Sequence, residues 1–306
     1  MKLIWNPARQ APCVLVLGMF DGVHRGHQAL LLRGREIADS LGLPLCVCTF
    51  EPHPLAVLIP QRAPRRLTSQ GERARLMALY GADELCVHRF TRELAAMPPE
   101  DFLAVLKETY HPAVAVCGFN FTFGREGRGN GSLLRSFASA HGFSAEVIPE
   151  VVLDGATVSS TRVRRCLEAG DIREVSRLLG HAWTLCGAVE DGKHIGRSLG
   201  FPTANVHIPA GKALPAFGVY ACCLTDEDGQ HHRAVVNVGR HPTLPDGPET
   251  VEAYVLGETL ALYGRHVRLT FFERLRPEIR FDTVAELRSR IAADAEQARR
   301  LFDAWR

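Results

Sequence analysis

The segment CVLVLGMFDGVHRGHQALL, residues 13–31, sets the fold of the first half of the chain. Its first five residues, Cys13–Leu17, form a short uncharged apolar run, which is typical of a strand buried on both faces. A glycine-rich turn follows, and the apolar residues then take a helical period through Gln28–Leu41. A buried strand that leads through such a turn into a helix predicts a parallel α/β sheet.

The same alternation of strand and helix continues to about residue 180. Further strand candidates rich in Val, Leu and Cys are Pro44–Phe50, Glu84–His88, Ala113–Cys117 and Ser144–Pro149. A capping box at Ser69–Glu72 and the acidic, proline-led stretch Pro98–Asp101 each predict the start of a helix. We therefore expect a Rossmann-like parallel sheet covered by helices on both faces, with ligands bound beyond the carboxyl ends of its strands.

The second half has short strand candidates separated by connections that contain Gly and Pro. These candidates are Trp183–Glu190, Phe217–Leu224, Arg233–Val238, Val251–Leu256 and Val267–Phe272. The pattern predicts an antiparallel barrel or sandwich. A second capping box, Thr283–Glu286, predicts a terminal helix with an apolar stripe at Leu287, Ile291, Ala295, Ala298 and Leu301. The sequence thus predicts two dissimilar domains, residues 1–180 and 181–306.

The composition excludes several classes of protein. Of the 306 residues, 46% are hydrophobic and 23% charged, which is typical of a globular chain rather than a disordered one. The formal net charge of +2 gives no indication of a nucleic-acid partner. The longest uncharged apolar runs, residues 11–20 and 41–50, are shorter than the ~20 residues that cross a bilayer, so we expect no membrane span.

The cysteines and the first seven residues indicate the cellular compartment in which we expect the protein. The nine cysteines are odd in number and form no CxxC pair, which favours small buried hydrophobes in a reducing cytosol over disulfides or a zinc site. Met1–Pro7 lacks the basic, apolar and small-residue pattern of a secretory signal. We expect a cytoplasmic protein, and the oligomeric state stays open.

Two imidazoles, His24 and His27, lie where the first strand meets its helix. Gly22 and Gly26 let the backbone approach a ligand, and the free N–H groups of a helix N-terminus suit an anion. Histidines at this place can bind nucleotide phosphates and stabilise the charge that develops during transfer. A glycine-rich turn with surface histidines is the alternative.

A second candidate phosphate site is the stretch SSTRVR, residues 159–164. Hydroxyl groups followed by arginines at the start of a helix can neutralise and orient a triphosphate. A well-capped helix with solvated arginines is the alternative.

A third candidate is GKHIGRSLGFPTAN, residues 192–205. Its three glycines, Gly192, Gly196 and Gly200, make a loop whose amides can face phosphates. Thr203 and Asn205 then alternate along a presumed strand, which puts both side chains on one face. Oxygen ligands beside a phosphate loop suit Mg²⁺. A purely structural Gly/Pro loop is the alternative.

The conjunction of H-x-G-H with SSTRVR about 130 residues later resembles the nucleotidyltransferase superfamily. With TFEPHP at residues 49–54 and CGFNFTFG at 117–124, the chain is similar to the bifunctional riboflavin kinase/FAD synthetase family. The resemblance implies that the first domain is an FMN adenylyltransferase, in which the FMN phosphate attacks the α-phosphorus of ATP and pyrophosphate leaves.

By position, the resemblance also implies roles for individual residues of this domain. His24 and His27 would contact the ATP phosphates, while Ser160, Thr161 and Arg164 would hold their β- and γ-end. Asn120 would lie near the flavin phosphate or the nucleotide. The nucleotide-binding turn would be completed by Gly18, Phe20, Asp21, Gly22 and Gly26.

Residues 192–205 resemble the riboflavin kinase module, and the rest of that module follows in register. The matching stretches are GVYA at 218–221, NVGRHPT at 237–243, VEAY at 251–254, LYG at 262–264 and RLRPE at 274–278. The resemblance implies transfer of the γ-phosphoryl group of ATP to the 5′-hydroxyl of riboflavin, with Glu252 as general base and Thr203 and Asn205 as ligands of Mg²⁺ and the phosphates. Substrate-binding positions would be Gly192, Gly196, Arg197, Gly200, Pro202 and Asn237.

The chain departs from the family pattern at Tyr254 and Gly257, where the family frequently has His-x-x-Asp. The affinity of the kinase site for flavin is therefore expected to differ from that of relatives with the frequent pattern. Two other hypotheses remain: a monofunctional enzyme that keeps one domain for structure or regulation, and a flavin- or nucleotide-binding regulator without catalysis. A relation to tRNA synthetases through H-x-G-H lacks support, because the chain has no anticodon-type domain and no basic surplus.

Overall fold

The computed structural model describes residues 1–190, 200–240, 248–258 and 260–304. Its contacts divide the chain into two compact units: Met1–Arg66 with Gln70–Ser160, and Leu67–Ser69 with Thr161–Arg306. The predicted domain boundary at residue 180 therefore differs from this division by the helices α7 (Ser160–Ala169) and α8 (Ile172–Leu179). α8 packs against a strand of the second unit, which is why the contacts group it with that unit. The boundary at residue 180 stays a prediction.

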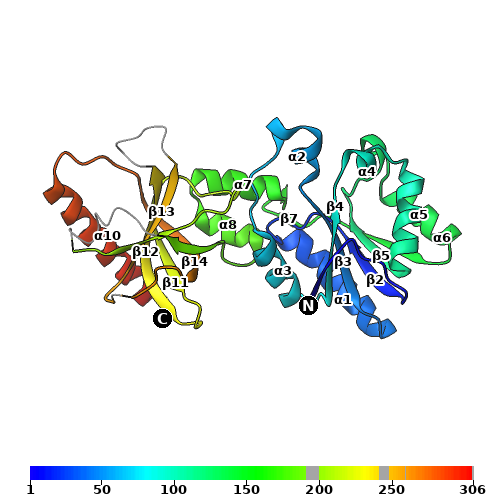
Figure 1. The fold of residues 1–306 in the computed structure, drawn as a ribbon, viewed down its shortest axis with the longest axis horizontal. Coiled ribbons are helices and arrows are strands. Elements are labelled where there is room, and N and C mark those ends of the chain that lie inside the picture. Colours follow the sequence, from blue (N-terminus) through cyan, green and yellow to red (C-terminus); the bar gives the residue numbers. More distant parts are fainter. Residues whose placement is uncertain (191–199, 241–247, 259, 305–306) are drawn as a thin grey trace. The chain divides into compact units, whose positions relative to one another are not determined.

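The first unit is built on a six-stranded parallel sheet, as the sequence predicts (Figure 1). Its strands are β1 (Lys2–Trp5), β2 (Cys13–Leu17), β3 (Leu45–Glu51), β4 (Glu84–Arg89), β5 (Pro112–Gly118) and β6 (Ser144–Ile148). The order β1-β4-β3-β2-β5-β6 places β2 between β3 and β5, where the direction of chain winding reverses. In open parallel sheets the crevice at such a reversal, beyond the carboxyl ends of the strands, is where ligands bind.

Helices cover both faces of this sheet. α1 (Arg25–Leu41) and α3 (Gln70–Leu79) lie on one face, and α5 (Pro99–Tyr110) and α6 (Gly131–Ala140) on the other. The short helices α2 (Pro54–Leu58) and α4 (Arg92–Ala96) lie in the connections. Successive residues of a strand point to opposite faces. Val14 and Val16 therefore pack with α1 and α3, whereas Leu15 and Leu17 pack with α5 and α6. Two separate cores fix the central strand.

Two edge elements of the first unit lay outside the sequence prediction. β1 adds to the sheet by pairing in parallel with β4, although it is only four residues long. A short antiparallel hairpin joins β7 (Val152–Leu153) to β8 (Ala156–Thr157) before α7 begins. Mostly exposed segments of this kind carry little apolar periodicity, and that periodicity is the signal on which strand prediction rests.

The second unit is a closed antiparallel barrel, which decides between the barrel and the sandwich that the sequence allowed. Its strands are β9 (Thr184–Glu190), β10 (Thr203–Val206), β11 (Gly218–Thr225), β12 (His231–Arg240), β13 (Glu249–Val255) and β14 (His266–Pro277). They pair in the order β10-β13-β12-β11-β14-β9, and β9 pairs with β10 to close the ring. In the core the rings of Trp183 and Tyr220 each meet Phe271 edge-on, at 5.0 and 5.4 Å between centroids.

The terminal helix α10 (Val284–Ala304) lies along the outside of the barrel (Figure 1). Of the predicted apolar stripe, Ala298 and Leu301 pack against the cluster of Val219, Ala221 and Val235 on β11 and β12, as expected. Phe302, which was not predicted, joins the same cluster. Thr283 caps the helix by accepting a hydrogen bond from the Glu286 amide at 3.2 Å. The predicted capping signal is thus present in the structure.

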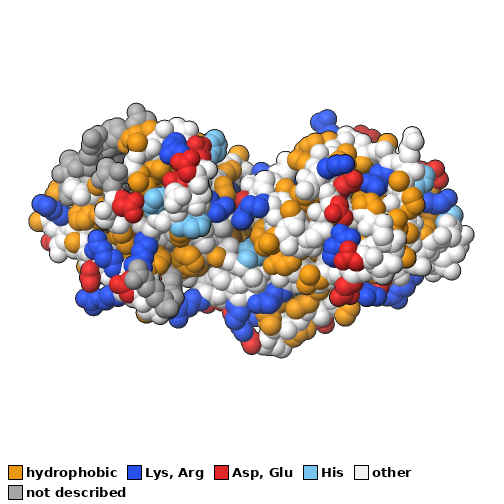
Figure 2. Space-filling view, turned by 90° about the horizontal axis from the view of Figure 1, so that it is seen from below, with side chains coloured by type: hydrophobic (Ala, Val, Ile, Leu, Met, Phe, Trp, Pro, Cys, Tyr) orange, Lys and Arg blue, Asp and Glu red, His pale blue; other side chains and the backbone are white. Residues whose placement is uncertain are grey.

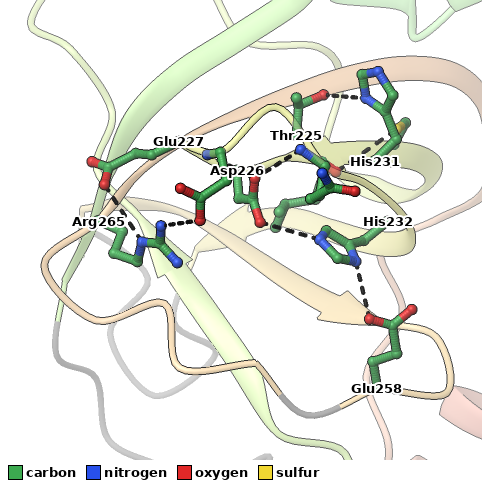
Figure 3. Close-up of polar contacts among 11 residues, drawn as sticks. Thr225, Asp226, Glu227, His231, His232, Glu258 and Arg265 are labelled. Atoms are coloured by element: carbon green, nitrogen blue, oxygen red, sulfur yellow. Dashed lines mark hydrogen bonds and ion pairs between the residues drawn. The ribbon is translucent and has the colours of Figure 1, made fainter.

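A polar cluster ties the β11–β12 hairpin to neighbouring loops of the barrel (Figure 3). One carboxylate oxygen of Asp226 accepts hydrogen bonds from the backbone amides of Asp228 and Gln230. The His232 ring joins Asp226, at 3.3 Å, to Glu258, at 3.0 Å. Arg265 reaches Glu227 and Asp228 on the same turn. The cluster fixes the end of the hairpin.

Charged side chains of both signs are interspersed on the face shown in Figure 2, in keeping with the small net charge. Within the described ranges, none of the helices combines the length and the apolar character that crossing a membrane requires. Six cysteines, at positions 13, 46, 48, 86, 117 and 222, are buried, as expected for small hydrophobes.

Candidate active sites

The turn after β2 is a compact loop held by backbone hydrogen bonds. Phe20, Gly22 and Val23 take positive φ angles of 54°, 84° and 41°. Positive φ is costly for a β-branched side chain, so the surrounding contacts must hold Val23 in place. The Val23 amide donates to the Phe20 carbonyl at 3.2 Å, and the Gln28 side-chain amide donates to the Val23 carbonyl at 2.8 Å. The loop is thereby fixed at the carboxyl end of the central strand.

His24 and His27 lie together at the start of α1. His24 is the N-cap residue, and its Nδ1 accepts a hydrogen bond from the His27 amide at 3.4 Å. A neutral imidazole that accepts at Nδ1 carries its proton on Nε2, so Nε2 is the donor of His24. The two rings stack with 3.7 Å between centroids. A Cβ on Gly26 would lie 3.1 Å from the His24 ring, which explains the glycine there.

The environment of His27 keeps its ring neutral. Burial lowers the pKa of His27 well below 6.5, and electrostatic interactions with His24 and Arg73 lower it further. The Nδ1 atom of His27 is buried and has no hydrogen-bond partner among the described residues. A neutral ring can donate one hydrogen bond to a phosphate oxygen without carrying a charge.

A buried arginine beneath this turn was missed by sequence reasoning. Arg73 on α3 has a side chain only 6% exposed, and it donates to the Met19 carbonyl and to Glu51, both at 3.2 Å. The second carboxylate oxygen of Glu51 accepts from Arg66 at 3.0 Å. The only sequence signal was an arginine directly after the capping-box glutamate, which by itself is typical of a solvated helix face.

The segment 158–160 lies beside the histidine turn. The Ser160 hydroxyl donates to the Asp21 carbonyl at 2.9 Å, and the Val158 carbonyl lies 3.7 Å from the position of a Gly26 Cβ. The structure thus brings Ser160 to the turn that carries His24 and His27. Asn120 is exposed beyond the end of β5, the strand next to β2.

Thr161 and Arg164 follow Ser160 on the first turns of α7 and belong to the second compact unit. Thr161 is exposed and Arg164 is half-buried. Between them, Arg162 is held by an ion pair with Glu174 of α8 at 3.0 Å. That pairing gives Arg162 a structural contact, in contrast to the phosphate-binding role predicted for Arg164.

On the barrel, the predicted kinase residues form a row across neighbouring strands. Asn205 of β10 is the direct cross-strand partner of Glu252 on β13, and Glu252 is the direct partner of Asn237 on β12. Thr203 is paired in the next row with Tyr254. Direct partners have their side chains on the same face of a sheet, so these oxygen-bearing groups share one face.

This face lines a cavity of about 1050 Å³ between the barrel and α10. Its polar part holds Thr203, Asn205, Asn237 and Glu252, all of them half-buried. Its apolar part is lined by Val219 and Val235 of the barrel and by Leu287 and Ile291 of α10. The cavity can therefore take a ligand with both a polar, phosphate-like end and a flat apolar part.

Tyr254, which stands where the family frequently has His, lies at an aromatic edge of the cavity together with Phe201. The Tyr254 ring meets Phe201 edge-on, with 5.3 Å between centroids. Gly200 is exposed with φ at 86°, and Pro202, directly before β10, is half-buried. Gly192, Gly196 and Arg197 lie outside the described residues.

Comparisons with family models and curated proteins cover both halves of the chain. The family model described as FAD synthetase matches residues 6–162, and the one described as riboflavin kinase matches residues 179–302. A bifunctional riboflavin kinase/FMN adenylyltransferase of Escherichia coli strain K12 is 35% identical over 308 residues, covering 99% of this chain and 98% of that protein. Its counterpart in Pseudomonas fluorescens is 38% identical over 291 residues, covering 94% and 93%.

A solved structure extends the likeness to the fold of nearly the whole chain. A Streptococcus pneumoniae protein described as a macrolide-efflux protein superposes with a TM-score of 0.89 at 29% identity, covering 98% of this chain and 99% of that one. Two family models cover the two halves, and the curated relatives share both over nearly their full length. The chain therefore belongs to the family of bifunctional riboflavin kinase/FMN adenylyltransferases, with its FAD synthetase domain in the first half and its riboflavin kinase domain in the second.

Proposed function

We propose that each of the two reactions has its own site: FMN adenylylation at the histidine turn after β2, and riboflavin phosphorylation in the cavity beside α10. The observation that carries the kinase assignment is the row Asn205–Glu252–Asn237, which puts a carboxylate between two amides on the wall of one cavity. The stacked His24 and His27, with Ser160 beside their turn, support the adenylyltransferase assignment.

At the kinase site, Glu252 accepts the proton of the riboflavin 5′-hydroxyl as its oxygen attacks the γ-phosphorus of ATP. The bond from the γ-phosphorus to the bridging oxygen breaks, and ADP leaves with that oxygen. A strand fixes the backbone of Glu252, so its carboxylate is oriented before the substrate arrives. Asn237 and Asn205 flank it and orient the substrate's polar groups.

The residues present fit a magnesium ion held jointly with substrate. Thr203 offers a hydroxyl oxygen and Asn205 an amide oxygen, ligands of the hard type that Mg²⁺ takes in proteins. Phosphate oxygens of the nucleotide and water would be further ligands, as is usual where Mg²⁺ is held together with substrate phosphates. When bound, the ion would neutralise phosphate charge and align the γ-phosphoryl group.

At the adenylyltransferase site, an oxygen of the FMN phosphate attacks the α-phosphorus of ATP and pyrophosphate leaves. This displacement needs no covalent enzyme intermediate, so catalysis consists of positioning and electrostatic stabilisation. His24 and His27 donate to ATP phosphate oxygens from the amino end of α1. Ser160, Thr161 and Arg164 hold the β- and γ-phosphates, Asn120 lies near the flavin phosphate, and the turn residues Gly18, Phe20, Asp21, Gly22 and Gly26 let the nucleotide approach.

We also propose that the chain works in the cytoplasm on small molecules only. All nine cysteines are free thiols, which suits a reducing compartment. The substrates are riboflavin, FMN and ATP, without a nucleic-acid or membrane partner. The phosphate loop Gly192, Gly196 and Arg197 would complete the kinase site.

A product assay tests the division into two sites. The full chain is incubated with riboflavin, ATP and Mg²⁺, and separately with FMN, ATP and Mg²⁺, and the flavins are resolved by chromatography. FMN and FAD are expected from riboflavin, and FAD from FMN. Formation of FMN without FAD would remove the adenylyltransferase claim, and tight flavin binding without any ATP turnover would favour a regulator. Equal rates after chelation of the metal would contradict the role given to Mg²⁺.

A further inference from the structure

The row of cross-strand partners that contains Glu252 continues beyond Asn237 to a buried ion pair. Asn237 is partnered by Val219 of β11, and Val219 by Arg276 of β14. The register of β11 and β14 shifts just after this point, so that Leu275 has no direct partner. Such bulges re-aim the neighbouring side chains. The backbone is tight here as well, because a Cβ on Gly218 would lie 2.4 Å from the Arg276 carbonyl oxygen.

Each of the three nitrogens of the Arg276 guanidinium donates a hydrogen bond to its own chain. Its Nε lies 2.9 and 3.0 Å from the two carboxylate oxygens of Asp294 on α10, and its Nη2 donates to the same carboxylate at 2.7 Å. Its Nη1 donates to the Pro277 carbonyl at 3.0 Å, and its plane lies over the Phe281 ring at 5.8 Å. Because each of its nitrogens donates to a protein acceptor, Arg276 is arranged to hold the helix.

The partner of Arg276 is the most deeply buried carboxylate that faces the cavity. Asp294 is 2% exposed, whereas Arg276 is 10% exposed, and Arg290 adds a second contact to Asp294 at 3.1 Å. A carboxylate and a guanidinium buried together give a rigid, directional connection, and loss of one partner leaves an unpaired charge.

The ion pair divides α10 into two parts with different surroundings. On its C-terminal side, Ala298 and Phe302 pack into the apolar cluster on β11 and β12. On its N-terminal side, Leu287 and Ile291 line the cavity and remain only half-buried. The apolar packing therefore anchors one end of the helix, and the Arg276–Asp294 pair connects the helix to the barrel next to the part that forms the cavity wall.

We propose that Arg276 and Asp294 are positioning residues of the kinase reaction, which hold the wall of α10 at the distance from Glu252 that fits the flavin substrate. The inference rests on the proposed placing of the kinase site in this cavity. The pair acts on substrate binding rather than on the phosphoryl transfer itself, since neither residue has a donor or acceptor assigned to the reacting groups.

Steady-state kinetics of FMN formation test the proposal in the full chain. Asp294→Asn and Arg276→Gln are each expected to raise the KM for riboflavin by about tenfold or more while kcat stays within about twofold, because a displaced wall weakens binding of the ground state and the transition state equally. The double variant is expected to show no larger KM than either single variant, because two partners of one contact are not additive.

The same helix offers a matched control. Asp303 also pairs with an arginine of the barrel, Arg233 at 2.8 Å, but it is 61% exposed and lies away from the cavity. Asp303→Asn should leave the KM for riboflavin unchanged. FAD formation from supplied FMN, measured on every variant, reports whether the first unit is intact.

The possible outcomes separate this inference from the site assignment. If Glu252→Gln leaves FMN formation intact, the kinase site itself is misplaced. If Glu252→Gln abolishes it while Asp294→Asn leaves KM unchanged, only the positioning role is wrong, and a fall in kcat for Arg276→Gln alone would make Arg276 a substrate contact instead. If Asp294→Asn fails to fold, Arg276→Lys, which keeps the charge but loses the bidentate geometry, is measured instead, and an unchanged KM there overturns the proposal.

Discussion

The imidazole rings of His24 and His27 lie stacked, with their centroids 3.7 Å apart and their planes 18° apart. Two protonated rings at this distance would repel each other, so a positive charge on both at once is unfavourable. Burial, with electrostatic interactions from His24 and Arg73, lowers the pKa of His27 well below 6.5. His27 therefore stays neutral across the physiological range and can serve as a hydrogen-bond donor to a phosphate oxygen.

Replacing His27 with alanine should suppress FAD formation and leave FMN formation largely intact. Loss of one donor to a transition-state oxygen typically lowers kcat by about 100-fold or more. The two rates are measured on one preparation, with FMN or riboflavin as the starting flavin. Loss of both activities in a folded His27→Ala protein would contradict the assignment of two sites.

Replacing Glu252 with glutamine should have the opposite effect. Glutamine keeps the size of the side chain but cannot accept the proton of the 5′-hydroxyl, so FMN formation is expected to fall by about 10²–10⁴-fold. FAD formation from supplied FMN should persist. Glu258→Gln is the matched control, because Glu258 is an exposed carboxylate that pairs with His232 outside the cavity. A similar loss in both variants would speak against a general base at Glu252.

Replacing Arg73 with methionine should weaken the first unit and slow FAD formation together. The Met19 carbonyl and Glu51 each lose a buried donor, which costs about 1–3 kcal/mol of unfolding free energy. Urea unfolding and the rate of FAD formation are measured in parallel. Arg66→Met removes the other partner of Glu51 from a more exposed position, so a cost of only about 0–1 kcal/mol is expected. An equal cost in the two variants would show that burial of Arg73 is not what matters.

The polar cluster at the β11–β12 hairpin (Figure 3) should lower the stability of the second unit at acidic pH. Burial favours the protonated form of Asp226, but hydrogen bonds from Gln230, His232 and Asp228 outweigh it and lower the pKa of Asp226 below 3.8. A carboxyl whose pKa is lowered on folding stabilises the fold above its unfolded pKa, and that stabilisation is lost as the pH falls through the folded value.

Thermal unfolding of the native chain and of Asp226→Asn at pH 7 and pH 3 tests this expectation. The native chain should lose more stability between the two values than the variant, which has no carboxyl to titrate at this position. Glu258→Gln, at the exposed end of the same network, should change this difference little. A native chain that is no more sensitive to acid than Asp226→Asn would rule out the contribution of this carboxylate.

Local patterns were sufficient to predict the main elements. The continuous apolar run Cys13–Leu17 is β2 with the same bounds, because a strand covered on both faces must be apolar throughout. The capping box at Thr283 marked the start of α10, since a helix end must satisfy its amides with nearby side chains. The helix after the histidine turn begins three residues earlier than predicted, at Arg25, because His24 itself is the N-cap.

The amino-acid sequence by itself therefore determined the division into two dissimilar domains and the candidate site residues. Strand periodicity, helix caps and motif spacing are all short-range signals. Only the tertiary structure decided which distant residues meet. Asn205, Glu252 and Asn237 form one row of cross-strand partners. Arg73 donates a hydrogen bond to the Met19 carbonyl, and Arg276 forms an ion pair with Asp294. These contacts depend on strand order, register and helix packing, which arise from burying the whole apolar surface at once. No stretch of a few residues contains that information.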